Sequence, residues 1–303
     1  MICNQCPRKC NVDRTRTAGY CKSPEEFRLS RAALHFWEEP CISGKNGSGA
    51  VFFSGCNLGC LFCQNYEISH ENKGMTVSDD GLIKIFENLI EQGANNINLV
   101  NPTHYAVQLA TLLKKYKPSV PVVYNSSGYE STETLKMLDG LVDIYLPDFK
   151  YIRNDKALKY SRAEDYPEVA MRALEGMYLQ RGKTEFDENG IMKKGMIIRH
   201  LILPSNTNSS LKILDFINEK FPNAYVSLMA QYTPCNDLSA VPELDRKITE
   251  REYNKVVDYA LNLGMDKIFI QSGKSADEKF IPDFDFTGII NVLEKRMYDE
   301  KVF

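Results

Sequence analysis

Three closely spaced cysteines place the strongest constraint on this chain of 303 residues. Cys56, Cys60 and Cys63 follow directly on Ala-Val-Phe-Phe-Ser, which is predicted to form a strand over residues 50–54. A [4Fe–4S] cluster that is fully ligated by protein takes four thiolates, so three cysteines leave one iron with an open coordination position. Structural zinc takes four ligands, mostly from paired cysteines, and the triplet has no obvious fourth. The pattern therefore predicts a cluster-binding loop, with zinc or redox thiols as the alternatives.

Composition excludes several classes of protein. The first ten residues contain no apolar stretch that would form a signal-peptide core, which argues against a disulfide framework in an oxidising compartment. No run approaches the roughly 20 apolar residues that cross a bilayer. The net charge is −3, without the basic excess typical of nucleic-acid-binding proteins. We therefore expect a cytoplasmic protein that binds neither a membrane nor nucleic acid.

Short β-rich runs alternate with helical runs from residue 50 onward. Strands are predicted over residues 50–54, 97–100, 122–124, 144–146, 196–203, 225–229 and 267–270. One helix is predicted to begin after Ser78 and to end before Gly93, and others cover residues 105–115, 132–138, 167–180, 210–220, 250–263 and 288–295. Repeated βα units predict a parallel sheet with outer helices that curls toward a barrel, with an open doubly wound sheet as the alternative.

Polar residues follow most of the predicted strands. Because the carboxyl ends of parallel strands meet at one edge, these residues are expected to lie around the cysteine loop. Taken singly, each of them also fits an ordinary turn or the start of a helix. The candidates are Asn101, Thr103, Asn125, Asp148, Lys150, Arg199 and Gln231.

A second group of cysteines lies at the N-terminus. Cys3, Cys6, Cys10 and Cys21 have the spacing Cys-x2-Cys-x3-Cys-x10-Cys, and Cys41 competes with Cys21 for the fourth position. A loop-rich segment with little core of its own gains stability from a bound metal, so a four-thiolate site is predicted. The spacing fits zinc and a second [4Fe–4S] cluster equally well, and plain thiols are the remaining alternative. Cys235 is predicted to be an ordinary thiol.

The loop sequence resembles the radical S-adenosylmethionine (SAM) superfamily. Its signature, Cys-x3-Cys-x-aromatic-Cys, is matched with Phe62 in the aromatic position. The resemblance implies a [4Fe–4S] cluster whose open iron binds SAM, and reductive cleavage of SAM to a 5′-deoxyadenosyl radical. It also implies a partial (β/α)6 TIM-like barrel over residues 46–303, preceded by a cysteine-rich metal-binding segment over residues 1–45.

Several segments resemble one branch of that superfamily, the pyruvate formate-lyase-activating enzymes. The closest resemblance is to pyruvate formate-lyase-activating-enzyme-like proteins with an N-terminal cysteine motif, and it includes the segment over residues 38–44. Asp148-Phe-Lys150 fits the Asp-x-Lys motif of the branch, and Asn65 fits the residue that follows its cysteine loop. Arg199 fits an arginine that contacts the methionine end of SAM, a task that suits a planar guanidinium. The resemblance thus implies that Arg199, Asp148 and Lys150 bind SAM.

One motif of the branch is absent. The activating enzymes carry Gly-Gly-Glu after the second strand, where it binds the amino group of SAM. Here Asn101-Pro-Thr103-His takes that place without a carboxylate. Asn101 or Thr103 can accept the hydrogen bond, but an uncharged acceptor makes a weaker contact with an ammonium group.

Three functional hypotheses follow. The first is an enzyme that passes the SAM-derived radical to a protein or peptide, with a glycyl-radical enzyme as the leading partner and flavodoxin or ferredoxin as the electron donor. The second is radical modification of another protein, peptide or small molecule. The third, from a different class, is a non-catalytic iron–sulfur or zinc redox protein. The polar residues at the strand ends favour an enzyme, since a redox sensor needs no such residues.

Overall fold

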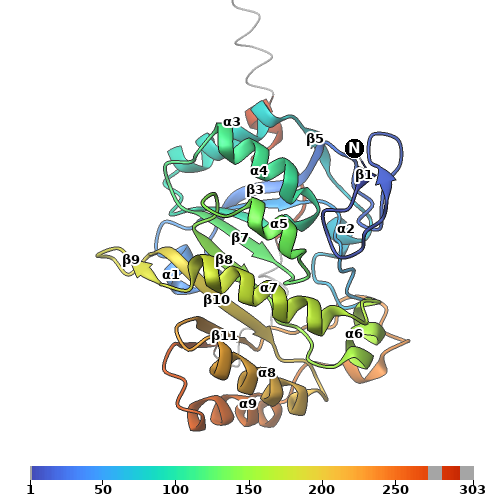
Figure 1. The fold of residues 1–303 in the computed structure, drawn as a ribbon, viewed down its shortest axis with the longest axis vertical. Coiled ribbons are helices and arrows are strands. Elements are labelled where there is room, and N and C mark those ends of the chain that lie inside the picture. The colour runs from blue at the N-terminus through green and yellow to red at the C-terminus, as the bar shows by residue number, and fades with distance from the viewer. Residues whose placement is uncertain (1, 272–281, 294–303) are drawn as a thin grey trace, which may run out of the picture.

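The computed structural model describes residues 2–271 and 282–293. The fold is α/β, and its centre is a mixed β-sheet. The parallel strands of this sheet follow one another in chain order from one side to the other: β4, β6, β7, β8, β10, β11 and β12. Figure 1 shows α4, α5, α7 and α8 in front of these strands. The order contains no reversal, whereas a doubly wound sheet requires one. The doubly wound alternative is therefore wrong.

The elements have the following bounds. The strands are β1 (Ile2–Cys3), β2 (Val12–Asp13), β3 (Phe27–His35), β4 (Ser48–Phe53), β5 (Met75–Val77), β6 (Ile97–Val100), β7 (Val122–Ser126), β8 (Ile144–Pro147), β9 (Glu185–Phe186), β10 (Met192–Leu201), β11 (Tyr225–Met229) and β12 (Ile268–Ile270). The α-helices are α1 (Pro40–Ser43), α2 (Tyr66–Ser69), α3 (Asp79–Glu91), α4 (Ala106–Lys115), α5 (Thr132–Met137), α6 (Asn154–Ser161), α7 (Tyr166–Arg181), α8 (Thr207–Lys220) and α9 (Glu250–Asn262).

The seven predicted strands and six of the predicted helices are confirmed, with shifted ends. The strand predicted over residues 196–203 begins earlier, at Met192, and ends at Leu201. Ser78 caps α3 as predicted, because its Oγ accepts the N–H of Gly81 at 3.2 Å. The helix predicted over residues 288–295 is helical from residue 290 to 293, and its last two positions lie outside the described residues.

Strand β3 was not predicted. It pairs antiparallel with both β4 and β5 and so extends the main sheet on one side. Arg28, Ser30 and Arg31 interrupt its apolar residues, which hides the strand in the sequence. The chain then enters α1, where Cys41 and Ile42 are buried in the same core cluster as Val123 and Ile197. Cys41 therefore lies in the core of the sheet.

The helices pack against one face of the sheet through apolar side chains. Leu82, Phe86 and Leu89 of α3 belong to one core cluster with Ile97 and Leu99 of β6, and all five are fully buried. This burial is what the helical spacing of apolar residues in α3 predicts. Because the outer residues of the strands bind the helices, the alternate residues face the interior of the curved sheet.

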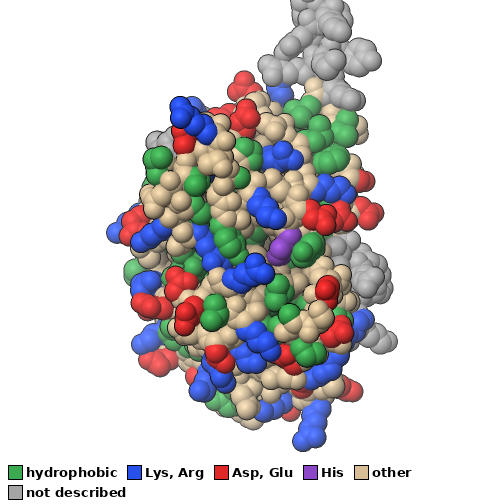
Figure 2. Space-filling model, turned by 90° about the vertical axis from the view of Figure 1, so that its right-hand side faces the viewer, with side chains coloured by type: hydrophobic (Ala, Val, Ile, Leu, Met, Phe, Trp, Pro, Cys, Tyr) green, Lys and Arg blue, Asp and Glu red, His purple; other side chains and the backbone are tan. Residues whose placement is uncertain are grey.

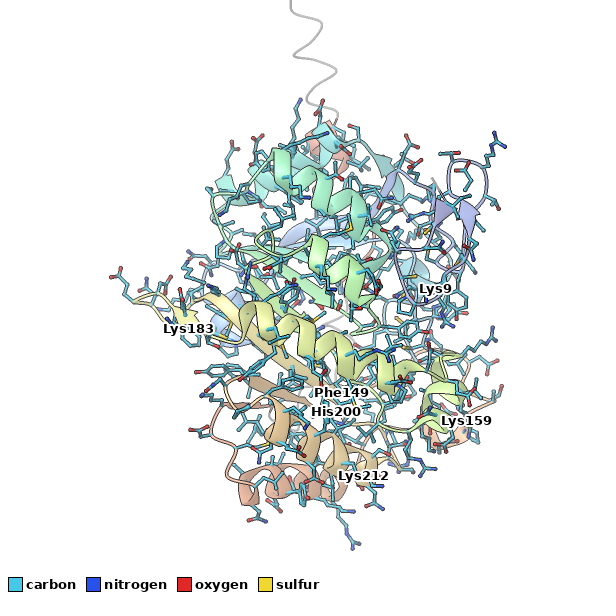
Figure 3. The ribbon with its side chains drawn as sticks, in the orientation of Figure 1. Lys9, Phe149, Lys159, Lys183, His200 and Lys212 are labelled. Carbon is cyan, nitrogen blue, oxygen red and sulfur yellow. The ribbon has the colours of Figure 1, made fainter. Side chains whose placement is uncertain are left out.

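The strand β10 shows how neighbouring residues face different sides. His200 is buried against the helices, where Nδ1 lies 2.8 Å from the Phe149 carbonyl and Nε2 lies 2.8 Å from Ser210 Oγ (Figure 3). Burial lowers the pKa of His200 to about 4, so the ring is neutral. Its neighbour Arg199 takes part in the interior site described below.

The face seen in Figure 2 carries acidic and basic side chains intermixed, without an area of one sign. Among the residues that the structure describes, no helix is both long and apolar enough to span a bilayer.

Close approach of backbones at Gly55 generates a first prediction. Gly55 has φ +90°, and an added Cβ would lie 2.5 Å from the Cys21 carbonyl oxygen and would also overlap Ser23 Oγ. Gly93 has a similar φ of +91° with nothing within 4 Å of an added Cβ, so it is a matched control. Gly93→Ala should cost about 1 kcal/mol for the left-handed backbone alone. Gly55→Ala should cost about 1–3 kcal/mol more, because it also displaces the N-terminal segment.

The free energies of unfolding are to be measured by urea titration of the two variants and the unaltered protein. Equal losses for Gly55→Ala and Gly93→Ala would contradict the close packing of residues 21–23 against the cysteine loop.

Candidate functional site

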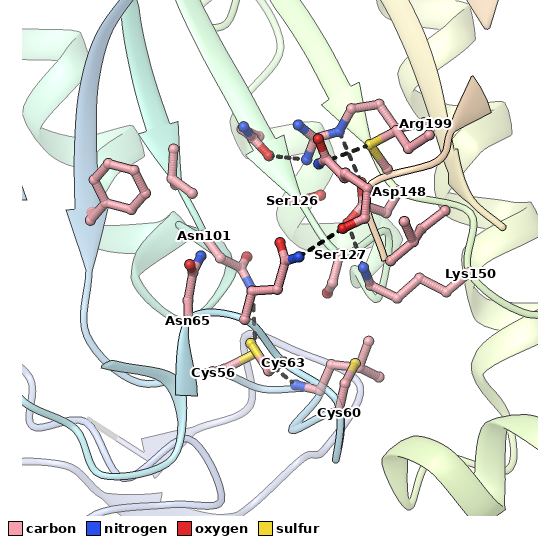
Figure 4. A pocket seen from close by; sticks show the side chains of 18 of the residues that line it. Cys56, Cys60, Cys63, Asn65, Asn101, Ser126, Ser127, Asp148, Lys150 and Arg199 are labelled. Carbon is pink, nitrogen blue, oxygen red and sulfur yellow. Dashed lines mark hydrogen bonds and ion pairs between the residues drawn. The ribbon is translucent and has the colours of Figure 1, made fainter. Parts of the chain in front are cut away.

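A cavity of about 260 Å³ lies at the carboxyl edge of the parallel strands (Figure 4). The three cysteines of the loop after β4 line it together with polar residues from the ends of β6, β7, β8 and β10. The predicted site residues that line it are Cys56, Cys60, Phe62, Cys63, Asn65, Asn101, Asn125, Asp148, Lys150, Arg199 and Gln231. Thr103 is the one predicted residue of this set that does not line the cavity.

Hydrogen-bond donors lie at the sulfur atoms of the loop, and Cys56 and Cys60 have the clearest contacts. Cys56 Sγ accepts the backbone N–H of Leu58 and the side-chain amide of Asn101, each at 3.4 Å. Cys60 Sγ accepts the hydroxyl of Ser161 at 3.1 Å. Such donors stabilise negative charge on sulfur, which suits thiolates that bind iron.

Two thiols of the loop, Cys56 and Cys63, need a cation to become thiolates. Burial, reinforced by repulsion from Cys60, raises the pKa of the Cys63 thiol to about 12. Burial likewise raises the pKa of Cys56. Metal ligands must be deprotonated, so a positive group in the cavity is required to hold these sulfurs as anions. Three soft sulfur donors beside a cavity fit an iron–sulfur cluster better than a hard cation.

Opposite the sulfurs, Arg199 and Lys150 share the carboxylate of Asp148 (Figure 4). Arg199 Nε donates to Asp148 Oδ1 at 2.9 Å, and Lys150 Nζ lies 2.5 Å from Asp148 Oδ2. Arg199 also donates to Asn125 Oδ1 at 2.5 Å. Despite burial, these two cations hold the pKa of Asp148 below its usual value. The far wall of the cavity is therefore charged and rigidly hydrogen-bonded.

Glu38 is a site residue that the sequence reasoning missed. It follows β3 and reaches the cavity, where its carboxylate accepts Arg199 Nη1 at 3.2 Å. Its other oxygen accepts the side-chain amides of Asn98 at 2.9 Å and Asn125 at 3.2 Å. The adjacent pair Glu38-Glu39 in an otherwise cysteine-rich segment was the available signal. No carboxylate follows strand β6 at the cavity, and Glu38 supplies one from the end of β3 instead.

Thr103 lies behind Asn101 and determines its orientation. Its hydroxyl lies 2.8 Å from Asn101 Oδ1 and 2.5 Å from Glu130 Oε1. A hydroxyl carries one proton and can donate to only one of these oxygens. Burial raises the pKa of Glu130 to about 7, so a protonated Glu130 can donate to Thr103 while Thr103 donates to Asn101. Asn101 is thereby left to donate its amide to Cys56.

The N-terminal cysteines lie together, away from Cys41. Burial raises the pKa of Cys6 to about 12, and the nearby thiols Cys21, Cys10 and Cys3 add to the effect. The backbone N–H of Tyr20 donates to Cys10 Sγ at 3.3 Å. Within the described ranges, no three His, Cys, Asp or Glu side chains are grouped closely enough to hold a metal ion as they stand. The four-cysteine site stays a prediction, with Cys21 as its fourth member.

Comparison with known proteins identifies the family. The sequence model of the radical SAM superfamily matches residues 50–178, which include the cysteine loop. An uncharacterised protein of Methanocaldococcus jannaschii is 30% identical over 277 residues, which cover 88% of this chain and 76% of that protein. The chain belongs to the radical SAM superfamily. Membership implies a [4Fe–4S] cluster and SAM, and the three sulfurs and charged wall of the cavity fit both groups.

Two solved structures are similar to parts of the chain. Streptococcus suis SuiB is 13% identical with a TM-score of 0.48, over 74% of this chain and 48% of SuiB. The FeFe-hydrogenase maturase HydG from Carboxydothermus hydrogenoformans is 13% identical with a TM-score of 0.44, over 76% of this chain and 55% of HydG. The chain thus spans about half the length of each.

The charged wall generates a second prediction. Arg199→Lys keeps the charge but loses the planar fork that contacts Asp148, Glu38 and Asn125. The affinity for SAM should fall about tenfold or more, which corresponds to ~1.4 kcal/mol. Calorimetric titration of the cluster-loaded protein with SAM measures this. Arg181→Lys is the control, since Arg181 Nε donates to the Val142 carbonyl on the helix side of the sheet. Unchanged affinity in Arg199→Lys would assign Arg199 a purely structural role.

Proposed function

We propose that this chain is a radical SAM enzyme that transfers the radical to a protein or peptide. When bound, the cluster supplies the electron that cleaves SAM to a 5′-deoxyadenosyl radical. The observation that carries the proposal is that Cys56, Cys60 and Cys63 line the same cavity as Asp148 and Arg199. A redox sensor needs the sulfurs but has no use for the buried charges opposite them.

Different residues of the cavity are proposed to bind the two charged groups at the methionine end of SAM, its carboxylate and its ammonium group. Arg199 and Lys150 supply cations for its carboxylate, and their hydrogen bonds to Asp148 keep both side chains in place. Glu38 supplies an anion for its ammonium group, in place of the carboxylate that is absent after β6. Asn101 and Gln231 supply uncharged hydrogen-bond partners. We further propose that the curved sheet is a partial (β/α)6 barrel whose open side is closed by the bound partner, which excludes water from the radical.

The acceptor of the radical is proposed to be a glycyl-radical enzyme. Support comes from the sequence segments that resemble the activating enzymes, above all Asp148-Phe-Lys150 and the segment around Arg199. The rim of the cavity adds to it, because Trp37 lines the cavity and is 63% exposed. Exposed aromatic residues are enriched where proteins bind one another. A small acidic electron carrier, flavodoxin or ferredoxin, is the proposed reductant.

The acceptor is tested by mixing the reduced, cluster-loaded enzyme and SAM with a candidate glycyl-radical protein. A persistent organic radical signal in electron paramagnetic resonance (EPR) spectra is expected on that protein. Cleavage of SAM without a radical on the acceptor would favour a different protein, peptide or small molecule as substrate.

The cysteine loop generates a third prediction. Cys56→Ala, Cys60→Ala and Cys63→Ala should each abolish cleavage of SAM to 5′-deoxyadenosine, because a cluster held by two thiolates does not assemble stably. Cys41→Ala is the matched control, since Cys41 is buried in a separate core cluster. Iron content and 5′-deoxyadenosine are to be measured after anaerobic reconstitution and reduction. Cleavage by any of the three loop variants would contradict the proposal.

The N-terminal segment generates a fourth prediction. We propose a second metal site at Cys3, Cys6, Cys10 and Cys21, with a [4Fe–4S] cluster favoured over zinc. The variant in which Cys56, Cys60 and Cys63 are all alanine should then retain about four irons with matching sulfide after anaerobic purification. One zinc per chain would make the segment a zinc site. If the variant contains neither iron nor zinc, the four cysteines are plain thiols and the proposed second site is wrong.

A further inference from the structure

Two buried hydroxyls lie at the sulfur of Cys60. Ser161 Oγ lies 3.1 Å from Cys60 Sγ and is itself 2.7 Å from the hydroxyl of Tyr151. Ser161 is fully buried and Tyr151 is 3% exposed, so water does not compete for either hydroxyl. If Tyr151 donates to Ser161, the proton of Ser161 is free to point at the sulfur. The Tyr151 hydroxyl also lies 3.9 Å from Cys60 Sγ, so Ser161 makes the closer of two hydroxyl contacts with this ligand and Tyr151 supports it.

Ser161 is held at the carboxyl end of α6, beside the cysteine loop. Arg162 follows it with φ +49°, a left-handed conformation that ends the helix. The backbone N–H of Leu61 donates to the Tyr160 carbonyl at 2.9 Å, so the loop between Cys60 and Cys63 is tied to the same turn of the helix. The position of the Ser161 hydroxyl therefore depends on how the end of α6 is fixed.

Arg8, between Cys6 and Cys10, fixes that end. Its guanidinium donates to the carbonyls of Ser161 at 3.1 Å and Arg162 at 2.6 Å. The same group donates to the carbonyls of Asn57 at 2.8 Å and Leu58 at 3.0 Å in the cysteine loop. Lys9, next to Arg8, and Lys159, in α6, mark the two segments in Figure 3. One side chain of the N-terminal segment thus joins the end of α6 to the cluster-binding loop.

The guanidinium is also held in place by aromatic rings. Its central carbon lies 3.8 Å from the centroid of the Tyr20 ring and 5.3 Å from that of Tyr129. Tyr20 directly precedes Cys21, and Arg8 lies between Cys6 and Cys10. The position of the Arg8 guanidinium therefore depends on residues from both ends of the N-terminal cysteine segment, and so on how that segment is folded.

We propose that Ser161 sets the reduction potential of the cluster through its hydrogen bond to Cys60, and that Arg8 is the positioning residue that holds Ser161 there. The inference rests on the proposed function, because it requires a cluster on Cys60. Hydrogen bonds to ligand sulfurs raise the potential by stabilising the more negative, reduced cluster. The carboxyl end of a helix has the opposite effect, since its carbonyls are negative. Arg8 offsets that effect because it binds the carbonyls of Ser161 and Arg162.

The potential also decides whether the cluster is reduced by a physiological donor. A more negative potential leaves a smaller fraction of the clusters reduced at a given donor potential, and cleavage of SAM slows accordingly. The N-terminal cysteine segment is therefore coupled to the radical chemistry through Arg8 without contributing a ligand to the cluster on the loop.

The test is a redox titration of the full-length, cluster-loaded protein, monitored by EPR. Ser161→Ala should shift the midpoint potential to a more negative value, and Tyr151→Phe should shift it less in the same direction. Ser48→Ala is the matched control, since Ser48 is equally buried and its hydroxyl binds Asn96 Oδ1 at 2.6 Å, away from the cysteines. Its midpoint should equal that of the unaltered protein.

Arg8 is tested with Arg8→Lys, which keeps the charge but loses the fork. The midpoint should again become more negative, while Arg16→Lys, at a residue whose side chain is 86% exposed, should leave it unchanged. Unchanged stability to urea together with a shifted midpoint would separate this role from a merely structural one. An unchanged midpoint in Arg8→Lys would remove Arg8 from the inference.

The outcomes separate this inference from the proposed function. An unaltered protein that assembles no cluster would contradict the proposed function itself. A loaded Ser161→Ala protein with an unchanged midpoint would overturn only the inference. If Ser161→Ala takes up no cluster, Tyr151→Phe decides the question, because it keeps the ring volume and removes only the hydroxyl.

Discussion

The site depends on the cost of burying negative charge on three sulfur atoms. Burial raises the pKa values of the Cys56 and Cys63 thiols, so these two become thiolates only with a positive partner. Around Cys56 and Cys60 the chain places N–H, amide and hydroxyl donors, and Ser69 and the backbone N–H of Asn65 do the same at Cys63, which stabilises negative charge on sulfur. Opposite them it places Lys150 and Arg199. These features fit a cavity that holds a metal cluster on the sulfurs and a charged ligand between the cluster and the buried cations.

Elements distant in sequence meet this requirement together. The parallel strands bring Asn125, Asp148 and Arg199 to one edge, as expected for side chains at the carboxyl ends of such strands. The segment before β4 then fills a gap that the strands leave. Glu38 extends from the end of β3 to Arg199, and α1 behind it is buried in the interior of the sheet. The short segment between β3 and β4 thus adds buried side chains to the core of the sheet and a carboxylate to the cavity.

The sequence predicted the parts of the molecule that have a local signature. The cysteine spacing, the two-sided apolar strands and the cap at Ser78 are each visible within a few residues, and the structure has the predicted strands with shifted ends and the cap at Ser78. Strand β3 was missed because Arg28, Ser30 and Arg31 interrupt its pattern. Glu38, Ser161 and Arg8 were missed because their roles arise only from tertiary contacts, at separations of up to 161 residues along the chain. Thr103 was expected beside the cofactor, and only the structure shows that it acts behind Asn101.

The central claim is that the cluster on Cys56, Cys60 and Cys63 has an open iron that binds SAM. EPR spectra of the reduced, reconstituted protein with and without SAM test it directly, since a ligand bound to one iron changes the electronic symmetry of the cluster. We expect a distinct change in the g values when saturating SAM is added. A reduced [4Fe–4S] signal that is identical with and without saturating SAM would show that the cluster has no open iron, and would contradict the account.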